Sequence, residues 1–202
     1  MAIKVANNNS LSAITSLPAA VSGGAMTLLE TQTASSSATI SFTSNIDSTY
    51  KEYQVHAINI HPEENGRVLS FQTDTGTNTN YNQTVTSTHF TTRHHEDASA
   101  TALGYDTGSD LAQSTSFIPL TSGSTANNND DNCCSILHLF DPSSTTFVKN
   151  FTSTMQNYHN ADLSNQLYVG GYCNVTAAID GVQFKMSSGN IDAGTIKMYG
   201  VN

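Results

Sequence analysis

The sequence predicts an all-β protein, namely a jelly-roll-like antiparallel β-sandwich that is preceded by an extended N-terminal arm. Charged residues make up only 11% of the 202 residues, so the Glu, Lys and Arg that surface helices use are scarce. Ser, Thr, Asn and Gln crowd nearly every segment instead, interleaved with β-branched and aromatic residues. About ten short runs of this kind follow one another between turn residues, with no helical periodicity and no internal repeat.

We expect the chain to divide into an N-terminal attachment arm, residues 1–25, and a β-sandwich domain, residues 26–202. The arm holds small apolar residues at irregular spacing, and the Gly23–Gly24 pair separates it from the first strand. Such a segment has little to bury against within itself. Its apolar residues are therefore expected to contact a partner subunit.

Four residues of the arm are the predicted attachment residues. Leu11, Ile14 and Leu17 are spaced three apart, which predicts one amphipathic turn. Pro18 is expected to end that turn, because proline cannot continue a helix. We therefore expect Leu11, Ile14, Leu17 and Pro18 to form the contact with the partner.

Alternation of apolar and polar residues predicts the strands in the first half of the sandwich. They span residues 26–33, 39–43, 53–60, 68–73 and 81–95. His61–Pro62 is expected to end the third strand, and Asn65–Gly66 is expected to reverse the chain. Because Asn-Gly before an alternating run is a strong hairpin signal, residues 53–60 and 68–73 are predicted to pair as a hairpin.

The second half shows the same pattern on either side of the expected polar loop at residues 121–132. Its strands are predicted over residues 116–120, 135–140, 146–155, 167–173 and 182–186, followed by a terminal strand in which Ile196 and Met198 alternate with Lys197 and Tyr199. Residues 135–140 form the most continuous apolar run. They are predicted to be a central strand that is buried on both faces.

The charge balance argues against nucleic-acid and membrane partners. Seven Lys plus Arg residues stand against sixteen Asp plus Glu, which gives a formal net charge of −9. The basic residues are scattered, whereas binding to phosphates or to an anionic membrane needs several clustered cations. No apolar segment is long enough to span a bilayer. We expect no nucleic acid and no membrane insertion.

The three cysteines do not predict a disulfide framework. Cys133 and Cys134 are adjacent, a bond between neighbouring cysteines is strained, and an odd count leaves one thiol over. Free thiols are typical of a reducing cytoplasm. The first seven residues also lack the apolar core of a signal peptide. We therefore expect the chain to fold in the cytoplasm of the cell that makes it.

The densest histidine cluster does not match a metal site. His94 and His95 are adjacent, and adjacent side chains of a strand point to opposite faces, so both rings cannot bind one ion without a bulge. The His-Glu-x-x-His spacing of zinc enzymes also fails, because Ser99 stands where the second histidine is needed. No metal ligand is predicted from this cluster.

A calcium loop is the second metal hypothesis, and residues 74–80 carry oxygen-bearing side chains at alternate positions. A calcium loop normally contains several carboxylates, including a bidentate acid at its end. Asp74 is the only acid in residues 74–80, and the residue that follows the segment is Tyr81 and not an acid. A turn-rich hairpin loop is the favoured interpretation. The sequence thus predicts no metal ligand and no cofactor.

No pattern of catalytic residues indicates an enzyme. The chain has no Gly-x-Ser-x-Gly elbow and no phosphate-binding glycine loop. Cys133 and Cys134 adjoin an apolar strand, which is typical of inert thiols. We expect no catalytic residue, and a glycan-cleaving enzyme on the same scaffold is the least favoured alternative.

Two loops are candidates for receptor contact, because loops at the end of a sandwich are free to vary while the strands hold them in place. Residues 74–80 and 121–132 are rich in Asn and Asp, whose side chains hydrogen-bond sugar hydroxyls. Asn78, Asn80 and Tyr81 are the predicted contact residues, with Tyr81 supplying an apolar face. The alternative is that these loops only solvate the domain.

Five phrases made of turn and strand residues carry a family resemblance. They are Asn7–Val21, Thr39–Tyr50, Ile58–Pro62, Leu137–Phe147 and Ser188–Gly200. The phrases are distributed along nearly the whole chain. They resemble phrases of virion structural proteins of marine tailed bacteriophages. The phrases contain no catalytic signature, so the resemblance indicates a kind of protein and transfers no binding residue.

The resemblance implies a non-enzymatic virion structural protein, either fibre-like or capsid-decorating, that docks on the particle through its arm. It implies assembly in the host cytoplasm and final localisation in the virion. The implied partners are other virion proteins of the capsid or tail and further copies of this chain, expected as a homotrimer. The alternative is a host-attachment adhesin module of the phage tail that binds a surface glycan.

Overall fold

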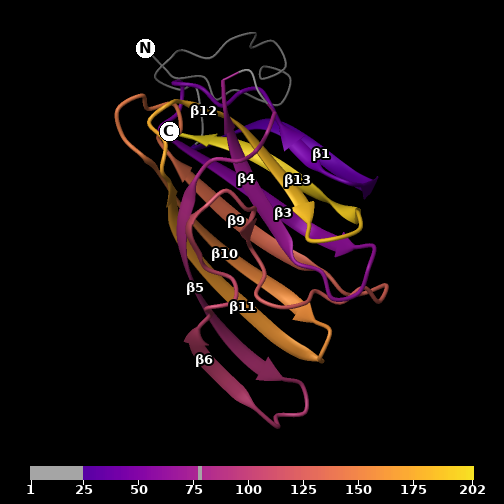
Figure 1. Ribbon diagram of the computed structural model, residues 1–202. Helices are drawn as coiled ribbons and strands as arrows, with labels where there is room; N and C mark the ends of the chain where they lie inside the picture. The colour runs from indigo at the N-terminus through magenta and orange to yellow at the C-terminus, as the bar shows by residue number, and fades with distance from the viewer. Residues whose placement is uncertain (1–24, 77–78) are drawn as a thin grey trace, which may run out of the picture.

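The structure is a computed structural model that describes residues 25–202 except 77 and 78 (Figure 1). This described part contains thirteen strands and no helix, and every strand pair in it is antiparallel. The all-β class is therefore confirmed, while the jelly-roll subtype stays a prediction. The predicted attachment residues Leu11, Ile14, Leu17 and Pro18 lie outside the described residues.

The strands form two sheets, which are the two layers of the fold (Figure 1). The larger sheet has nine strands, in the order β1 (Met26–Ser37), β13 (Ile191–Val201), β3 (Glu52–Pro62), β9 (Cys133–Phe140), β10 (Lys149–His159), β11 (Leu163–Cys173), β5 (Val85–His95) and β6 (Thr101–Tyr105), with β7 (Leu111–Ser114) also paired to β5. The smaller sheet has the order β2 (Ile40–Phe42), β12 (Ile179–Met186), β4 (Leu69–Thr75) and β8 (Ile118–Pro119).

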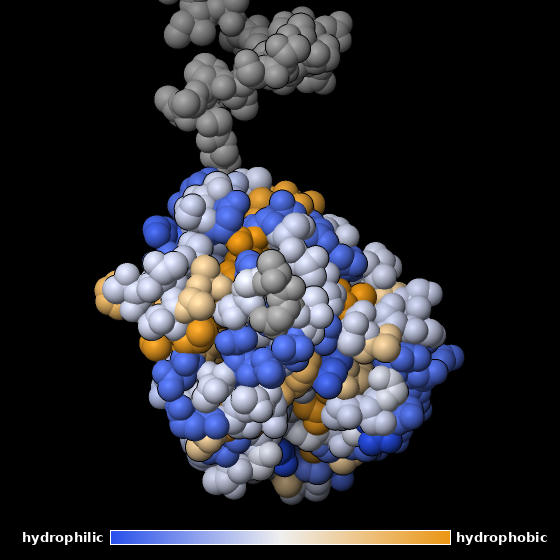
Figure 2. Space-filling model, turned by 45° about the horizontal axis from the view of Figure 1, so that its top comes forward, coloured by the Kyte–Doolittle hydropathy of each residue, from blue (hydrophilic) through white to orange (hydrophobic). Residues whose placement is uncertain are grey.

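The two sheets pack face to face around one hydrophobic core. Phe71 of the smaller sheet meets Phe151 of the larger sheet edge to face, with ring centroids 5.2 Å apart. Phe184 joins them at 6.2 Å from Phe71. Because side chains alternate along a strand, the other face of the larger sheet points away from this core. At the surface drawn in Figure 2, residues of near-neutral hydropathy predominate, and apolar residues form small separate groups.

The predicted hairpin between residues 53–60 and 68–73 is wrong. β3 pairs with β13 and β9 in the larger sheet, whereas β4 pairs with β12 and β8 in the smaller one. The turn at Asn65–Gly66 exists, with Gly66 at a φ of 77°, but it carries the chain from one layer to the other. A turn signal predicts where the chain reverses, and it does not specify which strand the chain then pairs with.

The prediction that residues 135–140 are buried on both faces is also wrong. β9 is central, but its residues alternate strictly between buried and more exposed positions, so one face is open. The strand that is buried on both faces is β4. Gln72 of β4 is fully buried. Its side-chain amide donates to the backbone oxygens of Gln83 and Ser116, at 3.1 and 2.9 Å, and these hydrogen bonds offset the cost of burying the amide.

Residues 121–132 do not form an exposed loop over their whole length, in contrast to the prediction. Thr121, Ser122 and Thr125 are fully buried. The side-chain amide of Asn165 donates to the carbonyl oxygen of Ser122 at 2.7 Å and to the side-chain oxygen of Asn157 at 3.1 Å. This segment therefore closes the core beside β10 and β11, which leaves the stretch from residue 127 to 130 nearer the surface.

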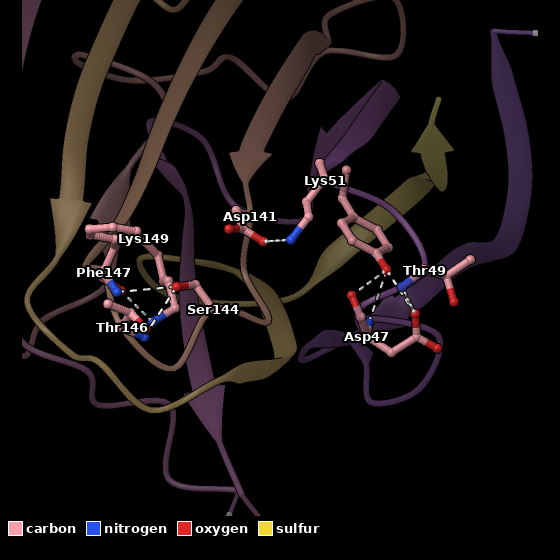
Figure 3. Close-up of polar contacts among 9 residues, drawn as sticks. Asp47, Thr49, Lys51, Asp141, Ser144, Thr146, Phe147 and Lys149 are labelled. Carbon is pink, nitrogen blue, oxygen red and sulfur yellow. Dashed lines mark hydrogen bonds and ion pairs between the residues drawn. The ribbon is translucent and has the colours of Figure 1, made fainter.

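One end of the sandwich is held by polar contacts between its loops (Figure 3). The Tyr53 hydroxyl accepts from the backbone N–H of Asp47 at 2.9 Å and donates to the Asp47 carbonyl at 3.0 Å. Lys51 pairs with Asp141 at 2.9 Å. The buried ammonium of Lys149 donates to the carbonyl of Phe147 at 2.8 Å and to two further carbonyls in the loop after β11.

Candidate functional site

The register of the larger sheet defines its outer face, the face that points away from the smaller sheet. Residues paired directly across antiparallel strands point to the same side. One outer row crosses eight strands and contains Thr31, Lys197, His56, Ile136, Thr154, Tyr168, Phe90 and Tyr105. The neighbouring row contains Leu28, Tyr199, Gln54, His138, Thr152, Gly170 and Thr88.

The outer face carries almost no formal charge along these two rows. Lys197 is their single Lys, Arg, Asp or Glu side chain, although the chain as a whole contains sixteen acids. The other positions are Thr, Gln, His, Tyr, Phe, Gly and aliphatic residues. A surface of this kind costs less to remove from water than a charged one.

Exposed apolar side chains gather on the same outer face. The described residues include ten exposed large apolar side chains, and eight of them lie on it: Met26, Leu28, Ile58, Phe90, Leu103, Tyr105, Ile136 and Phe140. The other two, Phe147 and Val148, lie in the loop before β10. Apolar side chains that share one face of a soluble protein mark an interaction surface, whereas scattered ones do not.

Three aromatic rings form a strip at the β11–β5–β6 end of the outer face. Phe90 stacks on Tyr168 with ring centroids 4.7 Å apart and planes inclined by 12°. Tyr105 is the register partner of Phe90 and is 55% exposed. The Tyr105 hydroxyl donates to the carboxylate of Asp110 at 2.8 Å, which holds the ring in place. The strip offers flat apolar surface with polar atoms at its margin.

Two adjacent hollows lie at the centre of the outer face. The first, of about 330 Å³, is lined by His56, Ile58, Cys134, Ile136, Gln156 and Gln166, among others. The second, of about 390 Å³, shares Cys134 and Gln156 with it and is also lined by His94, Glu96 and Tyr158. A register shift in β3 between Ala57 and Ile60 lies beside the first hollow. Bulges of this kind redirect side chains at binding sites.

His56 contributes a neutral imidazole to the first hollow. Burial lowers its pKa, and the nearby positive charges of His138 and Lys197 lower it further. A ring nitrogen of His56 lies 3.2 Å from the side-chain oxygen of Gln54, and the ring packs on Tyr199 with centroids 4.9 Å apart. A neutral ring of this type both donates and accepts hydrogen bonds.

Glu52 of β3 and His138 of β9 form an ion pair on the outer face. The ring Nδ1 of His138 lies 2.7 Å from Glu52 Oε1. Partial burial raises the pKa of Glu52, but hydrogen bonds from His138 and Gln54 outweigh this effect and leave the pKa below its ordinary value. The pair therefore places a carboxylate that accepts hydrogen bonds from His138 and Gln54 at the edge of the face.

Of the predicted receptor-contact residues, the two that the structure describes, Asn80 and Tyr81, do not lie on the outer face. Asn78 lies outside the described residues, and Asn80 is exposed in the segment before β5. Tyr81 is only 6% exposed and lines a small pocket with Asp74 and Asp180. The ring of Tyr81 is therefore part of a pocket wall and offers little exposed surface of its own.

The three cysteines differ in burial, since Cys133 and Cys173 are buried whereas Cys134 is half-buried and lines both hollows. All three cysteines are free. Burial raises the pKa of Cys133 to about 12 and that of Cys173 to about 11, so both thiols stay protonated at neutral pH and are poor nucleophiles. Within the described residues no group of three or more His, Cys, Asp and Glu side chains gathers around a common point. No helix suited to crossing a membrane occurs there either.

The outer face was not predicted from the sequence, because the apolar residues of the strands were all expected to lie in the core. Ile136 and Phe140 belong to the run that was predicted to be buried on both sides, and both side chains point outward. The signal that identifies them is the period of two along β9, which places His138 between them on the same face. Comparison of the chain with known protein families, with curated proteins and with solved structures found no match.

Proposed function

We propose that this protein is a non-enzymatic structural protein of a bacteriophage virion, fibre-like or capsid-decorating, that acts by binding other proteins. The five sequence phrases that resemble phage virion proteins support the assignment of the chain to this kind of protein. Residues 1–25 are proposed to dock on a capsid or tail protein through Leu11, Ile14, Leu17 and Pro18. Assembly takes place in the host cytoplasm, and the virion is the final location.

The observation that carries this proposal is the outer face of the larger sheet. Eight exposed large apolar side chains share it, and its two central rows contain Lys197 as their one formal charge. Weak charge lets identical copies approach one another with little repulsion. We therefore propose that the outer face packs against further copies of the chain, in a homotrimer, or against a neighbouring virion protein.

Glycan binding by a host-attachment adhesin is the second candidate function. The aromatic strip of Tyr168, Phe90 and Tyr105 favours it, because flat rings stack against the apolar faces of sugars. Gln156 and Gln166 in the first hollow supply amide groups that both donate and accept hydrogen bonds. This function is compatible with a place on the virion, since an adhesin is itself a virion component.

Antibody-labelled negative-stain microscopy tests the virion assignment. Particles are purified from the phage that encodes the chain, and the expected result is regular labelling at one location, head or tail. Particles labelled for their major capsid protein provide the positive control. Purified particles that carry that control label but none for this protein contradict the proposal.

Deletion of residues 1–24 tests the docking segment. The truncated protein is expected to remain folded and soluble but to be missing from particles assembled in its presence. The matched control is the full-length chain, added at the same concentration. Full incorporation of the truncated protein excludes the arm as the anchor, whatever the result of the microscopy.

A further inference from the structure

Asp74 is a buried carboxylate with an unpartnered oxygen. It is the next-to-last residue of β4 and is 2% exposed. Its Oδ1 accepts the backbone N–H of Thr75 at 3.0 Å. Its Oδ2 is buried and has no hydrogen-bond partner. A charged oxygen without a partner is costly to bury, so some positively charged or donating group is expected to complete its environment.

Asp180 brings a second carboxylate to the same point. The register between β12 and β4 shifts between Ile179 and Gly181, which pair with Thr75 and Asp74. Asp180 is thus the extra residue of a bulge that lies opposite the end of β4. Asp180 is half-buried and lines the same pocket as Asp74. Two carboxylates that line one small pocket form the kind of oxygen ligand set that a cation needs.

Both acids line a pocket of about 190 Å³, and every polar side chain in its lining carries oxygen as its polar atom. Thr43, Thr79 and Tyr81, whose side chains carry hydroxyl groups, complete the lining together with Gly76 and Gly181. A Cβ at Gly181 would lie 3.4 Å from the Cβ of Asp74 and 3.7 Å from the ring of Tyr81, so this glycine lies directly against both residues. The space is large enough for an ion together with several water molecules.

We propose that this pocket binds a calcium ion, with the carboxylates of Asp74 and Asp180 as its anionic ligands. Calcium takes six to eight oxygen ligands and accepts carboxylate, carbonyl, hydroxyl and water oxygens in irregular geometry. The pocket has no imidazole or thiol, which the softer transition metals prefer. Magnesium demands a near-octahedral set at shorter distances and is the poorer match for such a pocket.

The sequence did not predict this site because it showed only one of the two acids. Residues 74–80 contain a single carboxylate, so the hairpin-loop interpretation was favoured over a calcium loop. The second carboxylate comes from β12, which follows β4 late in the chain and lies beside it in the smaller sheet. The ligands are thus divided between two paired strands.

Thermal unfolding of the full-length protein with and without calcium is the first test. Chelator-treated protein is expected to unfold about 5 to 10 °C higher when calcium reaches about 100 times its dissociation constant. Magnesium at the same concentration is expected to give a much smaller rise. Titration calorimetry that finds no heat of binding up to about 10 mM calcium, together with an unchanged unfolding temperature, overturns the proposal.

Substitution of the two acids assigns the ion to the pocket. Asp74→Asn and Asp180→Asn are each expected to reduce the calcium-dependent rise to about 1 °C or less. In chelator, Asp74→Asn is expected to be at least as stable as the unaltered protein, because it removes an unpartnered buried charge. Asp130→Asn removes an exposed acid from another surface and is the matched control. Retention of the full calcium effect in both pocket variants overturns the proposal.

Terbium provides a readout that does not depend on stability. The chain contains no Trp, so ultraviolet excitation reaches a bound terbium ion through nearby tyrosines. Emission from the ion is expected to be sensitised by Tyr81, to fall several-fold in Tyr81→Phe, and to be displaced by calcium. Sensitised emission that is unchanged in Tyr81→Phe and in Asp74→Asn places the ion elsewhere and overturns the assignment.

Discussion

The ring of Phe90 lies flat on the ring of Tyr168, with the two centroids 4.7 Å apart and the planes inclined by 12°. The two residues are register partners on β5 and β11, so the backbone hydrogen bonds of the sheet hold the rings in this arrangement. Cross-strand aromatic pairs also stabilise the strands that carry them. A preformed pair of this kind needs little ordering when a ligand or another subunit covers it.

Loss of the stacked ring is expected to weaken glycan binding if the protein is an adhesin. Phe90→Ala should reduce affinity for a host glycan about 2- to 12-fold, which corresponds to the energy of one aromatic contact. A glycan array on purified protein measures the effect. Phe147→Ala is the control, because Phe147 is exposed in a loop away from the outer face. Equal binding by Phe90→Ala and the unaltered protein argues against a sugar site at the aromatic strip.

A charge at the centre of the outer face is expected to prevent self-association. Ile136→Asp places a carboxylate in the row between His56 and Thr154, where packing against another copy would bury it unpaired. Light scattering at micromolar concentration should show a homotrimer for the unaltered protein and a monomer for the variant. Phe147→Asp adds the same charge elsewhere and should stay trimeric. A monomeric unaltered protein contradicts self-association in solution.

Acid is expected to destabilise the fold through His89. Its ring is fully buried, both ring nitrogens lack partners, and burial lowers its pKa below the ordinary value of 6.5, against the charges of Asp106 and Asp110. Below pH 6.5 the unfolded chain therefore binds a proton that the folded protein does not. The free energy of unfolding falls as the pH falls, by up to about 1.4 kcal/mol per pH unit, until the folded pKa is reached.

Denaturant unfolding between pH 7 and pH 5 checks this prediction. His89→Leu should show a shallower loss of stability on acidification than the unaltered protein. His94→Leu is the control, because His94 is exposed on the same strand. Parallel curves for the unaltered protein and His89→Leu contradict a role for His89 in acid sensitivity.

A methyl group at Gly194 is expected to disrupt the junction of β13 and β3. Gly194 has a φ of 124°, and a Cβ there would lie 2.7 Å from the carbonyl oxygen of Asn59 and 2.9 Å from the Cα of Ile60. Gly194→Ala should cost about 2 kcal/mol or more, from backbone strain together with the clash. Gly104→Ala in β6, where a Cβ meets nothing within 4 Å, should change the stability little. Chemical denaturation of the two variants makes the comparison.

The sequence predicted most strands because their residues alternate. β10 and β13 show a strict period of two between buried and outward positions over most of their lengths, which is the local signal of a half-buried strand. β6 and β7 were not predicted, because their residues do not alternate between buried and exposed positions. All five residues of β6 are exposed, so no alternation exists for the pattern to detect.

Pairing partners and the candidate sites depend on contacts between distant segments, and local patterns do not encode these. Nothing near Val68–Thr73 indicates that this run belongs to a different sheet from residues 53–60. Likewise, no feature of the segment around Asp74 reveals that Asp180 lies beside it. Neighbours of this type follow from the packing of whole sheets, which depends on the complete chain.

The pairing of β1 with β13 sets an order of events during synthesis. Eleven strands separate these two neighbours along the chain, so β1 waits for its partner until all of them have left the ribosome. β3 waits as well, because β13 lies between it and β1. Until then the nascent chain presents unpaired strand edges, which makes this domain a slow folder and a client for chaperones that shield such edges.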